Sequence, residues 1–376
     1  MSDFTWVRLL LGLLIGLGSV LLLMIHKLFT ARAANPRDRF APFSVVFLNY
    51  LFVWILFLLW MLFYEPDIAL VVFRVSFHLL PSVIAHSLLL LALTPLLRRR
   101  VSAVTCAELW TLPFLLALPV MYFTNRETSL ENYVLFEPWL VLQIPRLALW
   151  IIVAVWAAGF LGVLGWKLLS HVRFRRTLLR RAYKASEATR SEFLTVWWEL
   201  CQTGTGFGWK LRIYRSPAAD SPITVGLFRR TSCLVLPERE YTDEELRMIF
   251  RHELIHLLHR DSAAKFGLVF LCALGWFIPS LWLGLGRAAE DMELCCDEFA
   301  TKTMREDERK TYASLLLSAA GTAKGFTTCL SASASGLRYR LSRVLHPEKH
   351  RVGYLITALL SVLFVFFYGA VGFVVV

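Results

Sequence analysis

Charged residues are scarce in this sequence, and its cysteines follow no paired pattern. Asp, Glu, Lys and Arg make up 18% of the 376 residues, while hydrophobic residues make up 57%, above the roughly 45–50% of an ordinary soluble domain. None of the seven cysteines lies in a C-x-x-C pair, and their number is odd. This argues against a disulfide framework and favours a reducing compartment. No internal repeat of broken apolar segments is visible, which disfavours a transporter.

The hydrophobic residues gather in long runs, which predict transmembrane helices. Runs long enough to span a bilayer cover residues 7–25, 43–64, 68–97, 104–123, 147–169 and 352–376. The start of the chain, MSDFTW, lacks the basic region of a signal peptide. We therefore expect an N-terminal membrane domain over residues 1–170 with about five transmembrane helices. A C-terminal transmembrane helix is expected over residues 352–376.

The surplus of basic residues indicates how these runs lie in the bilayer. The net charge of +12 would suggest nucleic-acid binding on a soluble protein. Here the basic loops follow the first, third and fifth runs, and the acidic loops follow the second and fourth. The positive-inside rule then places the N-terminus outside and residues 171–351 in the cytoplasm. We expect a multi-pass protein that contacts the lipid bilayer and makes no direct contact with nucleic acid.

His252, Glu253 and His256 form an H-E-x-x-H motif within the stretch RHELIHLLHRD. On a helix, side chains four residues apart lie on one face, roughly 5–6 Å apart at Cβ. The two imidazoles can therefore bind one Zn²⁺, and the Glu between them can act as a general base toward water. Thr242 and Glu245 form a capping box ahead of the motif, which predicts that a helix begins there.

A second motif, AEDMELCCDEFA, follows about 40 residues downstream. Its Glu293 and Asp297 are four residues apart and would share a helix face. Glu293 could complete a His₂Glu zinc site with one open position, and Asp297 could accept the free N–H of a ligand His. Cys295 and Cys296 lie between them, but adjacent helical residues point about 100° apart, so at most one could face a metal. We interpret both as packing residues.

The two motifs together resemble the BlaR/MecR-type membrane metallopeptidases, which are family fifty-six of the metallopeptidases and gluzincin-like. That family pairs H-E-x-x-H with a downstream E-x-x-x-D. The upstream stretch SPITVGLFRRTSCLVLP is similar to the family's S-P-x-x-x-G … I-x-L-P strand, and the likeness covers roughly residues 147–350. The resemblance implies one Zn²⁺ per chain on His252, His256 and Glu293. It also implies Glu253 as general base and Asp297 as the partner of a ligand His.

The resemblance also implies a fold and a function. The expected fold is mostly α, a helical transmembrane bundle with a cytoplasmic α+β gluzincin-like zinc peptidase domain over residues 171–351. The expected activity is that of a zinc metalloendopeptidase of the bacterial cell membrane. It would cleave a cytoplasmic regulator, such as a transcriptional repressor, or itself in transmembrane signalling. BlaR and MecR carry a penicillin-binding sensor after the last span, and this sequence, which stops there, is not expected to sense β-lactams by that route.

Several neighbouring residues could border the cleft. We expect the strand with Thr224, Val225 and Gly226 to pair its free backbone groups with an extended protein or peptide substrate. An ordinary hairpin of a small sheet is the alternative, and both can hold. Related enzymes use a His or Tyr donor for the oxyanion, and Tyr312 is the candidate here. His259 lies about 10.5 Å along the helix from His252, too far to share the metal.

Residues 263–286, between the two motifs, are apolar and long enough to be a further span. A single crossing would place His252 and Glu293 on opposite sides of the membrane, where they could not bind one metal. Pro279, with Gly275 and Ser280 nearby, predicts a bend. We therefore expect a re-entrant or membrane-associated segment that keeps both motifs at the cytoplasmic face.

Two other functions compete with this interpretation. An intramembrane site-two-type protease would bury its H-E-x-x-H within a span, and the charged neighbours Arg247, Arg251, Arg260 and Asp261 argue against that burial. A catalytically silent receptor or scaffold would keep the peptidase-like fold without its activity. Every expected ligand type is present in the sequence, which favours the enzyme.

Overall fold

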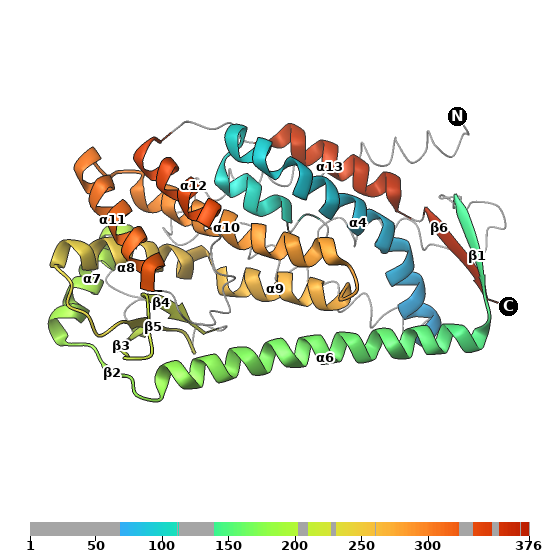
Figure 1. The fold of residues 1–376 in the computed structure, drawn as a ribbon, viewed down its shortest axis with the longest axis horizontal. Coiled ribbons are helices and arrows are strands. Elements are labelled where there is room, and N and C mark those ends of the chain that lie inside the picture. The colour runs from blue at the N-terminus through green and yellow to red at the C-terminus, as the bar shows by residue number, and fades with distance from the viewer. Residues whose placement is uncertain are drawn as a thin grey trace.

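Most of the residues that the structure describes lie in helices. A computed structural model of the protein describes residues 68–110, 112, 139–201, 210–226, 231–259, 261–322, 334–347, 353–368 and 370–375. The helices are α4 (Ile68–Arg100), α6 (Arg146–Leu179), α7 (Glu187–Cys201), α8 (Asp243–His259), α9 (Asp261–Leu274), α10 (Pro279–Thr301), α11 (Glu306–Thr322), α12 (Ala334–Leu345) and α13 (Tyr354–Phe367). The strands are β1 (Leu140–Ile144), β2 (Tyr183–Lys184), β3 (Arg212–Arg215), β4 (Ile223–Val225), β5 (Cys233–Leu236) and β6 (Val371–Val375) (Figure 1). The predicted mostly helical fold with a small sheet is confirmed.

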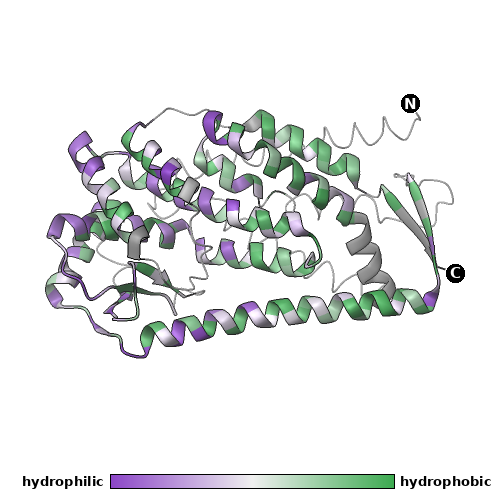
Figure 2. Cartoon of the chain, in the orientation of Figure 1, coloured by the Kyte–Doolittle hydropathy of each residue, from purple (hydrophilic) through white to green (hydrophobic). Residues whose placement is uncertain are grey.

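Two helices of the described residues are long and apolar enough to cross a membrane. They are Leu79–Arg100 within α4 and Arg146–Leu179, the whole of α6, and they correspond to the third and fifth predicted runs. Figure 2 shows hydrophobic residues along much of α6, which extends along most of the molecule. Its exposed apolar side chains include Leu147, Trp150, Ile151, Val155, Leu161 and Leu169. A surface of this kind is rare in water and suits contact with lipid. The runs at 7–25 and 43–64, and most of 104–123, lie outside the described residues.

Residues 263–286 turn back on themselves. After α9 ends, the backbone N–H of Ile278 donates to the Gly275 carbonyl at 2.8 Å, and α10 follows at once. Trp156 of α6 donates its indole N–H to the Leu274 carbonyl at 2.8 Å, so the tip of this hairpin packs beside α6. The turn keeps the helices of the two motifs, α8 and α10, in contact (Figure 1). That the hairpin lies within a membrane stays a prediction.

A four-stranded sheet lies beside α8. Its order is β2-β3-β5-β4, with β5 parallel to β3 and antiparallel to β4. Both faces of β5 are covered. Leu234 and Leu236 pack in the core formed with α7 and α8, whereas Cys233 and Val235 pack with Leu178 at the end of α6. The predicted stretch SPITVGLFRRTSCLVLP holds two strands: β4, an edge strand that includes Thr224 and Val225, and its partner β5.

The predicted helix over residues 352–376 is wrong in its last part. The helix α13 ends at Phe367, and Val371–Val375 form β6, which pairs in parallel with β1. This end of the chain is rich in Val, and β-branched residues fit strands better than helices. With 14 residues, α13 rises by only about 21 Å, less than the roughly 30 Å of a bilayer core.

Replacing Gly159 of α6 with Ala should weaken the contact between α6 and the hairpin tip. An added Cβ would lie 2.3 Å from the Trp276 ring, so the ring would have to move, at a cost of about 1–3 kcal/mol. We expect a lower Tm for the detergent-solubilised protein. Gly162→Ala is the control, since nothing lies within 4 Å of its added Cβ and Ala favours a helix. Equal Tm values for the two variants would contradict this packing.

Candidate metal centre

The helix α8 carries the H-E-x-x-H residues and starts with the predicted capping box. The Thr242 N–H donates to Glu245 Oε2 at 2.9 Å, and the Glu245 N–H donates to Thr242 Oγ1 at 3.2 Å. These reciprocal bonds satisfy two N–H groups of the first turn, which confirms the helix start. Phe250 on one side of α8 is fully buried in the core shared with α7 and the sheet. Another side of the helix therefore presents His252 and His256 toward α10.

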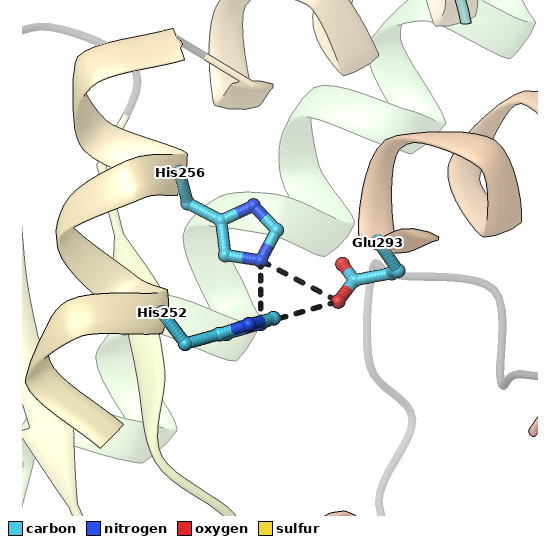
Figure 3. Close-up of side chains that lie close together, drawn as sticks. All are labelled: His252, His256 and Glu293. Atoms are coloured by element: carbon cyan, nitrogen blue, oxygen red, sulfur yellow. Dashed lines mark hydrogen bonds and ion pairs between the residues drawn. The ribbon is translucent and has the colours of Figure 1, made fainter. Parts of the chain in front are cut away.

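His252, His256 and Glu293 converge from α8 and α10 (Figure 3). The two Nε2 atoms lie 3.0 Å apart, and Glu293 Oε2 lies 3.6 Å from the first and 3.4 Å from the second. Three ligands of a tetrahedral zinc, each about 2.0–2.1 Å from the ion, would be separated by about 3.3 Å. The structure thus brings the three predicted ligand residues together in a triangle of the size that one zinc ion needs.

The other ring nitrogen of His252 faces a buried phenol. The Tyr312 hydroxyl lies 2.7 Å from His252 Nδ1 and donates to Asp297 Oδ1 at 2.8 Å, while Oδ1 itself lies 3.4 Å from Nδ1. Because the Tyr312 hydroxyl donates its hydrogen bond to Asp297, its oxygen can accept a hydrogen bond from Nδ1–H of His252. In that tautomer Nε2 of His252 keeps its lone pair for a metal. Asp297 therefore supports the ring largely through Tyr312. Tyr312 lies on the side away from the ligand atoms, where it cannot be the oxyanion donor suggested by the sequence.

Arg340 of α12 holds the Asp297 carboxylate. Its Nε donates to Oδ2 at 2.6 Å and its Nη2 donates to Oδ1 at 3.0 Å, a bidentate pair of strong, directional bonds. The same guanidinium lies 3.5 Å from Glu293 Oε2. No local pattern marks Arg340 in the sequence, because its partners lie on a helix that is distant along the chain.

Asp261 supports His256 from the other side. Its Oδ2 lies 2.6 Å from His256 Nδ1, and the Cys296 thiol donates to the same oxygen at 3.3 Å. The sequence suggests Asp261 as one of the charges that oppose burial, but the residue is only 7% exposed. Because α8 ends at His259 and α9 begins at Asp261, the carboxylate can turn back toward the motif. The sequence feature that could have predicted this contact is the position of Asp261, an acidic residue five positions after His256.

Cys296 also lies near a possible metal position. His256, Asp261 and Cys296 are close enough to share an ion, but they would use His256 Nδ1, which Asp261 already contacts. Burial raises the pKa of the Cys296 thiol, although His256 opposes this, so the thiolate that metals bind is disfavoured. Cys295 packs in a separate small core with Ala103. Both residues agree with the packing interpretation.

Basic groups surround the Glu293 carboxylate and favour its ionised form. Lys265 Nζ lies 3.1 Å from Glu293 Oε1. Burial raises the pKa of the Glu293 carboxyl, but His256 and Lys265 outweigh it and hold this pKa well below its usual range. Burial lowers the pKa of His256, but Cys296, Glu293 and Asp261 outweigh it, and this pKa lies well above its ordinary value. A metal that binds here must therefore displace a proton from His256.

Glu253 accepts a hydrogen bond from the edge strand β4. It is mostly buried, and Thr224 Oγ1 donates to its Oε2 at 2.7 Å. Val225 packs in the core against the end of α6. Gly226 has φ +129°, and an added Cβ would meet the backbone of Ser232 at 2.6 Å, so the turn out of β4 requires glycine. Contact of these three strand residues with a substrate stays a prediction.

His259 belongs to the interior. Its ring packs edge-on against Phe299, with 5.0 Å between the ring centroids. Burial lowers its pKa to about 4, so the ring is neutral. It lies apart from the ligand triangle, in agreement with the expectation from its spacing.

The donor set fits zinc. Two imidazole nitrogens and one carboxylate oxygen are the protein ligands of many catalytic zinc sites, which leave a fourth position open. Each His ring contacts a buried group that fixes its orientation, as is usual for zinc ligands. The centre can therefore hold one divalent ion between α8 and α10.

Comparison with known proteins places these elements in a family. The family model described as BlaR1 peptidase M56 matches residues 141–344, which is more than half of the chain and runs from before α6 to the last turn of α12. Similar curated proteins include the regulatory protein BlaR1 of Bacillus licheniformis, 25% identical over 187 residues. Methicillin resistance mecR1 protein of Staphylococcus aureus is 28% identical over 136 residues.

These matches are partial on both sides. The first covers 50% of this chain and 30% of the relative, and the second covers 35% of this chain and 23% of the relative. The chain therefore spans less than a third of the length of the curated relatives it matches. The family model, by contrast, covers every residue of the centre described above. The chain belongs to the BlaR1 peptidase M56 family.

Proposed function

We propose that this protein is a membrane-bound zinc metalloendopeptidase with one Zn²⁺ per chain. The observation that carries the proposal is the triangle of His252, His256 and Glu293, with sides of 3.0–3.6 Å. Glu253 follows His252 on the same helix and supplies the general base. Membership of a peptidase family supports the same activity.

The chain's own residues would divide the work of peptide hydrolysis. Zinc on the three ligands would supply a Lewis acid that polarises the scissile carbonyl and acidifies water. Glu253 takes a proton from the attacking water and passes it to the leaving amine. The Thr224 hydroxyl donates to Oε2 of Glu253 and so orients its carboxylate. Asp261 and Tyr312 hold the two His rings with Nε2 toward Glu293, where these three residues would hold the zinc.

The membrane location rests on α4, α6 and the charge that follows α6. Both helices are long and apolar enough to span a bilayer. The basic stretch 173–184 follows the apolar part of α6 and favours the cytoplasmic face with its anionic lipids. We therefore propose a multi-pass protein of the bacterial cell membrane with its N-terminus outside and its peptidase domain in the cytoplasm.

The proposed substrate is a protein or peptide segment in extended form. The edge strand β4 lies next to Glu253 and could pair with such a segment by backbone hydrogen bonds. A cytoplasmic regulator such as a transcriptional repressor, or the protein itself, would fit a role in transmembrane signalling. The names of the similar proteins, a regulatory protein and a methicillin resistance protein, support that role.

Metal content gives the first test. Wild-type protein purified in detergent should hold close to one zinc per chain by mass spectrometry, and His252→Ala and Glu293→Ala should each lose it, because each removes one of three ligands. His346→Ala, at an exposed position, should keep the zinc. Zinc lost only with His252→Ala would remove Glu293 as a ligand. A wild type without zinc after metal-replete preparation would favour the receptor or scaffold.

Glu253→Gln should keep the zinc and lose peptide cleavage by about 10²–10⁴-fold, since an amide cannot accept the water's proton. Cleavage of the protein itself and of candidate peptides would be followed by intact-mass spectrometry. Glu244→Gln, exposed in the first turn of the same helix, is the matched control and should cleave as wild type does. Cleavage by Glu253→Gln at the wild-type rate would exclude Glu253 as the base.

Asp261→Asn should weaken zinc binding about 10- to 100-fold, because a neutral amide supports the His256 ring less well than a carboxylate. Competition with a fluorescent chelator would measure the Kd for zinc. Asp243→Asn, exposed at the start of α8, should leave it unchanged. Identical Kd values for Asp261→Asn and wild type would show that this buried contact does not act on the metal.

A further inference from the structure

A buried group of charges joins the end of α4 to the ligand helix α10. Arg98, in the last turn of α4, donates from Nε to Asp291 Oδ1 at 2.6 Å and from Nη1 to Glu290 Oε2 at 3.0 Å. Its Nη2 donates to the Arg287 carbonyl at 3.2 Å. Trp110 donates its indole N–H to Asp291 Oδ2 at 3.0 Å. Arg98 is 9% exposed and Asp291 is 1% exposed, so this charge pair is closed off from water.

The same group fixes the register between α4 and α10. Ser87 of α4 and Ser280 of α10 share a hydrogen bond of 2.7 Å near the start of α10. The same number of residues separates this contact from the Arg98–Asp291 pair on each helix, so the two helices run in parallel and in register (Figure 1). Asp291 precedes the ligand Glu293 by two residues. A helix is stiff over so short a distance, so a displacement at Asp291 also displaces Glu293.

A second route leads from Arg98 to the centre through α12. The Tyr339 hydroxyl donates to the Arg98 carbonyl oxygen, and the Arg98 guanidinium lies 6.0 Å from the centroid of the Tyr339 ring. The next residue of α12, Arg340, binds Asp297 with two hydrogen bonds and lies 3.5 Å from Glu293 Oε2. The end of α4 thus reaches the ligand carboxylate through α10 and through α12.

We propose that Arg98 is a positioning residue for the metal centre, which holds Glu293 at its ligand position and couples that position to α4. The inference rests on the proposed zinc site. If α4 moves along α10, it must carry α10 with it or leave the Asp291 carboxylate buried without its partner, and the second outcome is strongly unfavourable. A shift of this predicted membrane span therefore moves the third ligand and changes the affinity of the site for metal.

The test measures the Kd for zinc of the full chain in detergent, by competition with a fluorescent chelator. Arg98→Lys keeps the buried positive charge but cannot make the forked contacts of a guanidinium. Arg98→Met combined with Asp291→Asn removes the charges of this buried pair, while Glu290 keeps its ion pair with Arg287 at 3.1 Å. We expect the Kd to rise about tenfold or more in both variants. The absorption spectrum of the Co²⁺-loaded protein should change as well, because the ligand geometry changes. Arg99→Lys, at the exposed neighbouring position, should match wild type in both measurements.

The outcomes separate this inference from the proposed function. Wild-type protein that binds no zinc would refute the proposed function itself. Wild-type zinc binding together with unchanged Kd and Co²⁺ spectra in the Arg98 variants would overturn the positioning role alone. A lower Tm of the metal-free variants with unchanged Kd would show that Arg98 only stabilises the fold, which also overturns the role. If Arg98→Lys does not fold, the zinc Kd and the Co²⁺ spectrum of the double variant Arg98→Met/Asp291→Asn test the positioning role instead.

Discussion

Ion pairs between acidic side chains of α10 and basic side chains of other helices determine how the helices around α10 are arranged. The pairs are Asp291 with Arg98, Glu293 with Lys265, and Asp297 with Arg340. Removing one partner of a buried pair costs about 3–5 kcal/mol, so the helices that carry the partners must pack around α10 together. The pairs therefore place α4, α9 and α12 at the same time as they place the ligand carboxylate.

The two imidazoles proposed as ligands, His252 and His256, depend on buried acids in a similar way. His256 contacts Asp261 directly, while His252 reaches Asp297 through the Tyr312 hydroxyl. Both arrangements direct Nε2 toward Glu293 and make the rings better ligands. They come from different parts of the chain, since Asp261 follows the motif closely whereas Tyr312 lies on α11. The metal centre is thus built from five helices, α8 to α12, although the recognisable motifs lie on two.

The long helix α6 connects the remaining parts of the site. Trp156, in its apolar part, bonds to the turn of the α9–α10 hairpin, and Leu178, at its end, packs beneath β5 and the edge strand β4. Thr224 on that strand donates to Glu253, the proposed general base. One helix therefore sets the position of the hairpin that bears Glu293 and of the strand that orients Glu253. The proposed membrane span suits this role, because its apolar surface can face lipid while its two contacts hold the hairpin and the strand.

Features that depend on near neighbours along the chain can be predicted from the amino-acid sequence. The four-residue spacings of His252 with His256 and of Glu293 with Asp297 follow from the helical period. The Thr242–Glu245 capping box is likewise set within a few residues. The proposed His₂Glu site also implies that the segment between the motifs turns back, since one metal cannot be bound from both sides of a membrane.

Contacts between side chains that are distant along the chain depend on how the helices and strands pack, and the sequence pattern does not predict them. The burial of Asp261, the phenol of Tyr312 at His252, and the guanidinium of Arg340 on Asp297 all depend on how helices pack, and side-chain periodicity carries no information about that packing. The end of the chain was decided in the same way. An apolar run that could have continued as a helix forms β6 because β1 offers it a parallel partner. Helix periods and caps are local, whereas ion pairs and strand pairs need two distant segments to lie within hydrogen-bonding distance, and only the packed fold provides that.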